Sequence, residues 1–272
     1  MRFLMICLSL LMIQLPGQAL SPETVPASAP RIPAASTQMI LVITDEWQAV
    51  PATLYRYERP VGGAWQAAGK PIEAVVGSKG MGWGRGLHKD SDTNGDYRVE
   101  FDKRAPAGIF TLGAAFGLGS PAQARKWLRV LKMPYLQLKP GLFCIGDHES
   151  KHYNEIVDSR KVAKDWKDEH IENMNEIAVA DEQAYFWGVF VNHNVDSNPP
   201  GMQRDRISGS CIFLHIWKEA GHGTAGCTAM SRNNMVSVIQ WLDQARHPIL
   251  VQLPKAEYLR LKQAWNLPEL EE

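Results

Sequence analysis

The sequence lacks an excess of charge of either sign, because 29 Lys and Arg stand against 29 Asp and Glu among its 272 residues. General nucleic-acid binding depends on a positive field, so this balance argues against that class of partner. The chain also lacks the ~20-residue apolar run that a membrane-spanning helix needs. It shows no internal repeat, and its 45% hydrophobic and 21% charged residues are ordinary globular values,. These absences predict a globular protein that neither binds nucleic acid nor spans a membrane.

The N-terminus has the features of a secretory signal peptide. Arg2 gives a short positive region, and residues 3–15 form an apolar run of about 13 residues that leads into small residues,. We therefore expect 1–19 to be removed on export to the periplasm or cell envelope. Residues 20–38 hold four prolines among Ser, Ala and Thr, which predicts a flexible tether,. The remainder, 39–272, is expected to fold as a single domain.

Short runs of β-branched and aromatic residues predict a β-rich domain. Strands are expected at residues 39–44, 52–57, 72–76, 109–112, 135–138, 142–145, 185–192, 211–217 and 249–253. Helices are expected at 122–131, 162–179, 233–245 and 255–265, with the one at 162–179 as the main helix,. Strands and helices do not alternate regularly, which argues against a doubly wound α/β fold. The sequence thus predicts a single β-rich, mixed α+β domain with peripheral helices.

Three motifs point to metals or phosphates, and each lacks the context that its chemistry requires. His148–His152 matches HExxH, but the strand-like run and Gly146 before it do not predict the helix on which two His bind one zinc ion,. Asp90–Gly95 resembles the start of a calcium loop, yet its twelfth position is Phe101 instead of a bidentate Glu,. The glycine-rich loop at 77–86 has no GK[ST],. We expect no metal and no cofactor, with a zinc protease and a calcium site as alternatives.

His215 and Cys227 form the candidate catalytic pair. A thiol needs a base to become a nucleophile near neutral pH, and imidazole is the usual one. His215 lies in a strand-like run, and the polar, glycine-containing segment 218–223 is suited to turn the chain back toward it. Gly226 permits a tight backbone conformation, and the amides of Gly226 and Cys227 are candidates for an oxyanion hole. The alternative is that both side chains are ordinary core residues.

These residues lie in a segment that resembles the active-site region of the L,D-transpeptidase (YkuD-like) catalytic domain family. Ser208–Ser231 contains a His followed, after a loop, by the family's Ser/Thr-x-Gly-Cys motif, here Thr-Ala-Gly-Cys. Arg104–Phe110 resembles its Thr/Ser-Pro-x-Gly-x-Phe segment, and Asp147–Asn154 and Tyr185–Asn194 resemble segments of one branch. Taken in order, the resemblance spans roughly 39–253.

The resemblance implies a β-rich fold whose sheets cradle a cysteine site, in an enzyme of the bacterial envelope that cross-links peptidoglycan stem peptides. By this resemblance Cys227 attacks a stem-peptide carbonyl to form a thioester, His215 takes the thiol proton, and an amine of a second stem resolves the thioester,. The implied reaction needs neither a metal nor a nucleotide. An L,D-carboxypeptidase or amidase that uses water at the same site is the main alternative, and a non-catalytic wall-binding module is a further one.

The chain departs from the family's commonest pattern at two positions. Where many members have Ser-His-Gly-Cys with an Arg two residues later, this chain has Ala225 and Ala229, so the contacts of that His and Arg are not carried over. We further expect a partly exposed Cys227 whose thiol pKa is lowered by His215, and a backbone carbonyl that orients the other nitrogen of His215. Candidate substrate-binding residues are Trp83, His193, Asn194 and Thr224.

The four cysteines suggest one disulfide. Cys7 falls in the expected signal peptide, which leaves three, and an odd number in an exported protein suggests one bridge and one free thiol,. If Cys227 is the nucleophile, Cys144 and Cys211 remain, each in an apolar strand-like run. We expect these two to form a disulfide, with two buried free thiols as the alternative.

Overall fold

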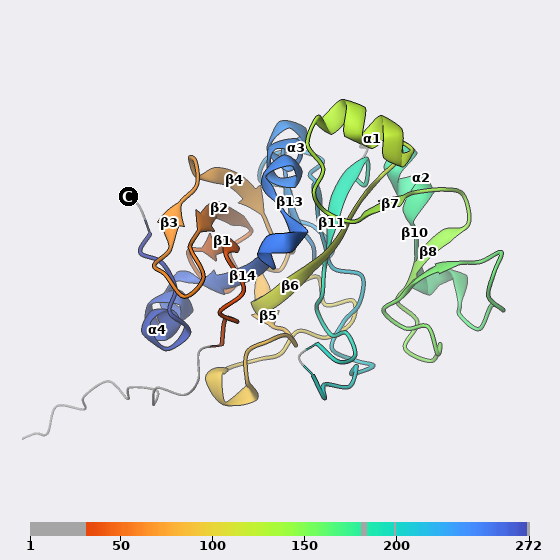
Figure 1. The fold of residues 1–272 in the computed structure, drawn as a ribbon. Helices are drawn as coiled ribbons and strands as arrows, with labels where there is room; N and C mark the ends of the chain where they lie inside the picture. Colours follow the sequence, from red (N-terminus) through yellow and green to blue (C-terminus); the bar gives the residue numbers. More distant parts are fainter. Residues whose placement is uncertain (1–30, 181–183, 199, 271–272) are drawn as a thin grey trace, which may run out of the picture.

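An eight-stranded β-barrel of mixed strand direction is the centre of the computed structural model, which describes residues 31–180, 184–198 and 200–270 (Figure 1). The sheet closes on itself because β1 pairs with both β14 and β2. Around the barrel the order is β1 (Gln38–Thr44), β14 (Ile249–Pro254), β6 (Ala105–Gly117), β11 (Trp187–Val191), β12 (Phe213–Ile216), β13 (Thr228–Met230), β4 (Ile72–Val75) and β2 (Pro51–Glu58). The β-rich, mixed α+β fold predicted from the sequence is confirmed.

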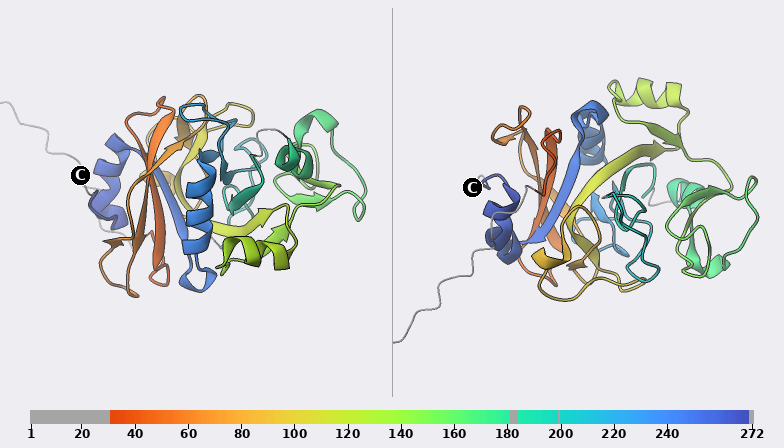
Figure 2. Two further views of the ribbon diagram at one scale, coloured as in Figure 1. Left: turned by 90° about the horizontal axis from the view of Figure 1, so that it is seen from above. Right: turned by 60° about the horizontal axis from the view of Figure 1, so that its bottom comes forward.

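Shorter strands extend the barrel, and a second sheet lies beside it (Figure 2). Three short strands pair with β2 or β6, namely β3 (Gln66–Ala67) with β2, and β5 (Met81–Trp83) and β7 (Tyr135–Gln137) with β6. The second sheet has three antiparallel strands, in the order β10 (Ile171–Asn173), β8 (Leu142–Ile145) and β9 (Ile156–Asp158). The short helix α2 (Met174–Val179) follows β10 and packs on β8.

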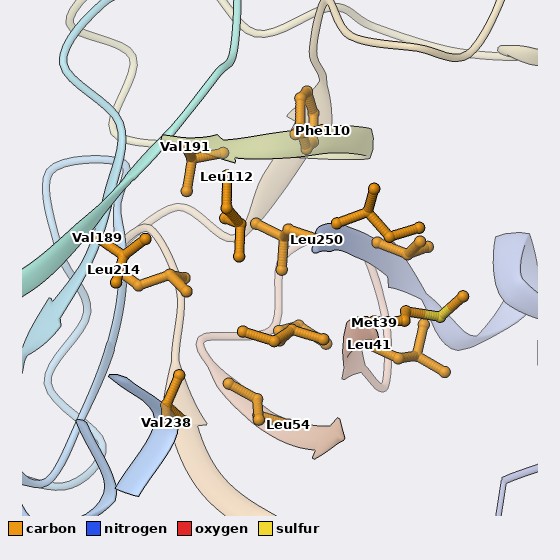
Figure 3. Packing of buried hydrophobic residues seen from close by; sticks show 14 of the residues in the cluster. Met39, Leu41, Leu54, Phe110, Leu112, Val189, Val191, Leu214, Val238 and Leu250 are labelled. Carbon is orange, nitrogen blue, oxygen red and sulfur yellow. The ribbon is translucent and has the colours of Figure 1, made fainter. Parts of the chain in front are cut away.

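Apolar side chains from the barrel strands and the helices form one large core. Leu41, Leu54, Leu214 and Leu250 come from four different strands and lie in one cluster with Val238 of α3 (Arg232–Trp241), as Figure 3 shows. Every residue of β1 is buried, in part because α4 (Lys255–Trp265) packs against β1 and β14. Burying each such leucine contributes about 1.5–3 kcal/mol. The packed core therefore holds β12 and β13 in place. These two strands position the site described below.

Capping residues define two of the helices that the sequence predicts. Ser120 caps α1 (Pro121–Leu128), because its side chain accepts a hydrogen bond from the Gln123 amide and Pro121 occupies the first helical position,. The Ser231 side chain caps α3 in the same way,. The helices expected at 122–131, 233–245 and 255–265 are confirmed as α1, α3 and α4, and η3 (Gln244–Arg246) follows α3.

The prediction of one long helix over 162–179 is wrong. In its place lie η2 (Asp168–His170), β10 and the six-residue α2. The apolar residues at helical spacing belong to different parts of the structure, since Trp166 packs with the second sheet whereas Met174 lies in another cluster. β10 forms because its backbone pairs with β8, with Glu172 opposite Cys144. Tertiary pairing therefore overrides the local periodicity.

The predicted signal peptide, 1–19, lies outside the described residues. Of the tether expected over 20–38, the structure describes 31–38, and this part is packed instead of free. Ile32 is 2% exposed, and Arg31 forms an ion pair with Asp92 at 2.6 Å. Within the described ranges, no helix has the length and apolar character needed to cross a bilayer.

Candidate active site

Two neighbouring strands bring His215 and Cys227 to one place. β12 carries His215, and Cys227 directly precedes β13, which pairs with β12 in parallel. Leu214 pairs with Thr228, so Cys227 lies level with Phe213, and the Phe213 amide donates to the Cys227 sulfur at 3.3 Å. Parallel pairing requires a crossover between the two strands. The chain thus turns back between His215 and Cys227, as the sequence predicts.

Cys227 is the free cysteine of the described residues, and it is buried. Its thiol donates toward the Cys211 carbonyl at 3.5 Å, and its side chain lies in one buried cluster with Tyr185. Burial is the main reason that the pKa of the Cys227 thiol lies well above its ordinary value, and the charge of Glu172 adds to this effect,. The expectation of a partly exposed thiol with a lowered pKa is wrong, because desolvation outweighs the stabilising contacts.

His215 is held as a neutral imidazole. Its Nδ1 lies 2.8 Å from the Ile216 carbonyl, which only accepts hydrogen bonds, so the proton resides on Nδ1 and Nε2 keeps a lone pair,. Burial lowers the pKa of His215 to about 4. The backbone carbonyl expected to orient the ring is present. Within the described residues no hydrogen bond joins His215 directly to Cys227, although both line the same cavity.

Thr224 and Gly226 shape the loop before the thiol. The Thr224 hydroxyl donates to the Cys227 carbonyl at 2.6 Å and accepts from the Gly226 amide at 3.0 Å. Gly226 has φ 149°, and a Cβ there would lie 3.1 Å from the Arg104 carbonyl, so a side chain would be strained,. The Gly226 amide therefore bonds to Thr224 in this state, and an oxyanion role would require it to exchange that partner.

Arg98 places a buried positive charge at the cavity wall. Its side chain is 2% exposed, and its ion pair with Asp102 is long, at 3.8 Å. Its Nε and Nη1 atoms have no hydrogen-bond partner among the described residues. A Cβ on Gly226 would lie 3.7 Å from Nη2 of Arg98, so the guanidinium lies close to the loop before Cys227. Its charge lowers the pKa of the Cys227 thiol, against the larger effect of burial.

These side chains line one cavity of about 530 Å³. This volume lies in the range of ordinary ligand pockets. Its wall includes Cys227, His215, Thr224, Arg98, Tyr185 and Glu172. The arrangement combines a thiol, a neutral base and a buried cation, which are groups that can take part in acyl transfer.

Tyr185 and Glu172 are functional candidates that sequence reasoning missed. The Tyr185 hydroxyl donates to Oε2 of Glu172 at 2.5 Å, and the Tyr185 ring lies edge-on to His215 with 5.3 Å between centroids. Burial raises the pKa of Glu172 to about 7. Tyr185 is the first residue of the strand predicted over 185–192 and lies just before β11, whereas Glu172 falls inside the helix that does not form. No spacing in the sequence links the two residues to the site.

Three predicted substrate-binding residues, Trp83, His193 and Asn194, lie in the interior and do not line this cavity within the described residues. His193 accepts from the Arg85 amide at 3.1 Å and donates to the Ser208 carbonyl at 2.9 Å. Asn194 donates to the Asp205 and Gly209 carbonyls. The indole of Trp83 donates to the Asn94 carbonyl. The contacts of His193 and Asn194 hold the loop that leads to Cys211, whereas Thr224 does line the cavity.

The HExxH motif lies in a turn, whereas the Asp90–Gly95 motif lies in a loop whose Asp92 is buried. His148 and His152 follow β8 in a turn, and His152 bonds instead to Glu155 at 3.0 Å. In the Asp90–Gly95 loop, which includes η1 (Asp90–Asp92), both oxygens of Asp92 accept from Arg31. Among the described residues, no cluster of three or more His, Cys, Asp or Glu side chains is arranged to hold a metal ion.

The predicted disulfide is confirmed. Cys144 and Cys211 are bonded, with 6.0 Å between their Cα atoms. Cys144 lies on β8 of the second sheet, and Cys211 lies just before β12. The bridge thus fastens the second sheet to the segment whose carbonyl contacts the Cys227 thiol.

Comparisons of the chain with models of protein families, with curated proteins and with solved structures found no match. The geometry of the site and the motifs of the sequence therefore carry the functional argument.

Proposed function

We propose that the protein is a cysteine acyltransferase of the bacterial envelope, an L,D-transpeptidase that acts on peptidoglycan stem peptides. The observation that supports this most is that the buried Cys227 thiol and a neutral His215 line one cavity of about 530 Å³. The Thr-Ala-Gly-Cys motif and the family resemblance supply the substrate class. The expected export signal is consistent with a substrate outside the cytoplasm.

In the proposed reaction, the thiol stays protonated until a substrate carbonyl is in place. The Cys227 sulfur then forms a bond to the carbonyl carbon while its proton passes to Nε2 of His215,. The amide C–N bond breaks, and His215 returns the proton to the leaving amine, which leaves a thioester. The amine nitrogen of a second stem then attacks the thioester carbonyl and loses a proton to His215. A new amide bond forms, the C–S bond breaks, and His215 passes the proton to the sulfur, which regenerates the Cys227 thiol. Arg98 would stabilise the negative charge that develops on the carbonyl oxygen,.

The raised thiol pKa and the lowered imidazole pKa fit this order of events. At pH 7 both groups are neutral, so the resting site does not hold a reactive thiolate–imidazolium pair. Proton transfer becomes favourable only as bond formation to the carbonyl proceeds. Such a site limits adventitious oxidation or alkylation of Cys227.

The decisive experiment incubates the purified protein with defined tetrapeptide muropeptides and reads the products by mass spectrometry. We expect cross-linked dimers with the wild-type protein and none with Cys227→Ala, because removing the nucleophile removes the covalent step. A chelator should leave the yield unchanged. The control variant is His148→Gln, which alters an exposed histidine in the HExxH motif and should behave as wild type.

The products separate the alternatives. Shortened monomers without dimers would show that water is the acceptor and would make the protein a carboxypeptidase. Unchanged muropeptides with a folded wild-type protein would refute an enzymatic function on this substrate. Turnover by a folded Cys227→Ala variant, checked by circular dichroism, would refute the assignment of the nucleophile.

A further inference from the structure

The turn at residues 98–104, which leads into β6, forms part of the cavity wall and has an unusual backbone. Phe101 and Lys103 both line the cavity, and both have φ 63°, in the left-handed region that residues other than glycine rarely adopt,. Residues in this conformation persist only where the surrounding structure holds them, and they cluster at ligand-binding sites. The turn thus keeps two exposed side chains at the cavity in a conformation that their residue types do not favour.

Asp102 holds the turn in this conformation. Its Oδ2 accepts a hydrogen bond from the Val99 amide at 2.8 Å, and its Oδ1 accepts one from the Arg104 amide at 2.9 Å. The same carboxylate lies 3.8 Å from the guanidinium of Arg98 and 3.7 Å from that of Arg104. Its side chain is 11% exposed. The acidic residue of the turn is therefore used inside the turn, whereas Lys103 lines the cavity.

Lys103 gives the cavity a cation that has no ion pair among the described residues. Two of the carboxylates that line the same cavity, those of Glu100 and Glu172, each accept a hydrogen bond from a tyrosine hydroxyl at 2.5 Å. A third, Glu169, lies in η2 beside the second sheet. Lys103 and the buried Arg98 thus make the wall formed by the turn positive, which favours an anionic group in the ligand.

The turn ends against the loop that precedes the candidate nucleophile. The Arg104 carbonyl lies 3.1 Å from the position that a Cβ on Gly226 would take. Lys103 is the residue before Arg104, with about 3.8 Å between their Cα atoms. An anionic group held by Lys103 would therefore lie within about one residue of the carbonyl that Cys227 attacks in the proposed reaction. The nearest such group in a stem peptide is the carboxylate of the residue whose amine leaves.

We propose that Lys103 binds the free carboxylate of the leaving residue and thereby selects peptides in which this carboxylate is not blocked. The contact supplies binding and orientation, and no bond to Lys103 forms or breaks in the reaction. Phe101, which is 56% exposed and lies 5.1 Å from the His170 ring, forms the adjacent apolar part of the wall. This inference deepens the proposed function and rests on its choice of substrate.

The test measures binding by isothermal titration calorimetry in the Cys227→Ala background, so that the peptide stays intact. The probes are the tetrapeptide stem with a free C-terminal carboxylate and the same peptide with a C-terminal amide. We expect the amide to bind about tenfold more weakly, because it carries no charge for the lysine to bind. Lys103→Gln should weaken binding of the free acid about tenfold and leave binding of the amide unchanged, whereas Lys103→Arg should retain the discrimination.

Lys79→Gln is the matched control. Lys79 is also exposed, and its amide donates to the Lys103 carbonyl at 3.1 Å, but its side chain lines a separate hollow. This variant removes the same charge from the same region without removing a cation from the cavity. It should bind both peptides as the Cys227→Ala protein does.

The outcomes separate this inference from the proposed function. Equal weakening of both peptides by Lys103→Gln would overturn the carboxylate contact, as would equal binding of the two peptides when Lys103 is present. Turnover of the free acid and the amide with equal kcat/KM by the wild-type protein would refute this inference alone. Discrimination between the peptides without any turnover would refute the proposed function and leave the carboxylate site in place. Binding of neither peptide to the folded protein would overturn both.

Discussion

His215 sets the acid limit of the proposed reaction at the scale of single residues. Burial lowers the pKa of His215 to about 4, so the imidazole stays unprotonated, and able to accept a proton, down to that pH,. We therefore expect kcat/KM to fall on the acid side only below pH 5. A free histidine base would make it fall near the ordinary pKa of histidine, about 6.5. The measurement is kcat/KM for muropeptide turnover from pH 4.5 to 8. A limb centred near 6.5 would contradict the buried, neutral base.

The candidate pair could be proposed from the sequence because its signal is local. His215 and Cys227 lie in one segment, and their residue types together indicate one chemistry. Tyr185 and Glu172 could not be found, because they come to the cavity of Cys227 only through the tertiary structure. The raised pKa of the Cys227 thiol could not be predicted from the sequence either, because it depends on burial by segments that are distant along the chain.

The disulfide is a covalent connection between two elements, because it joins β8 to the segment before β12. It closes a loop with a sequence separation of 67 residues between Cys144 and Cys211. Removing both cysteines by alanine substitution should lower the free energy of unfolding by about 4 kcal/mol, because the unfolded chain regains the entropy of the open loop. Urea unfolding followed by circular dichroism measures this change. A loss below about 1 kcal/mol would show that the second sheet is held by its packing alone.

Elements were predictable from the sequence where local signals and tertiary pairing agree. The residues of α4 match the helix predicted over 255–265, and β8 matches the strand predicted over 142–145. The segment 162–179 has helical spacing, but its middle residues pair with β8 and form β10. β13 has only three residues and was not predicted, because its position is defined by the neighbours β12 and β4.

Asp92 joins distant parts of the chain at the scale of the whole molecule. It accepts from Arg31 at 2.6 Å, near the start of the described chain, and from the Trp265 indole at 3.1 Å, at the end of α4. It also accepts from the Lys89 amide. A loop that resembles a calcium site in sequence therefore connects the two ends of the described chain. Asp92, one of the two acidic residues that suggest metal binding, instead forms an internal ion pair.

Buried neutral histidines make the stability of the whole molecule depend on pH. His88 accepts from the Ile109 amide and contacts the Gly84 carbonyl, and burial lowers its pKa to about 4, as it does for His215. Burial likewise lowers the pKa of His193 well below its ordinary value. Between pH 6.5 and 4 the unfolded chain binds protons at these sites and the native protein does not. The contribution of these three histidines to the free energy of unfolding is therefore complete above pH 6.5, and it is lost as the pH falls toward 4.

We expect the free energy of unfolding to fall between pH 6.5 and 4, by about 3 kcal/mol for each of His88 and His215,. Urea unfolding at half-unit steps of pH measures this slope. His88→Gln should reduce the slope by up to about 1.4 kcal/mol per pH unit, whatever its effect on stability at pH 7, because the slope counts protons and not contacts. A flat profile from pH 6.5 to 4.5 would mean that these histidines bind protons in the native state, and that the site reaches water more readily than its packing indicates.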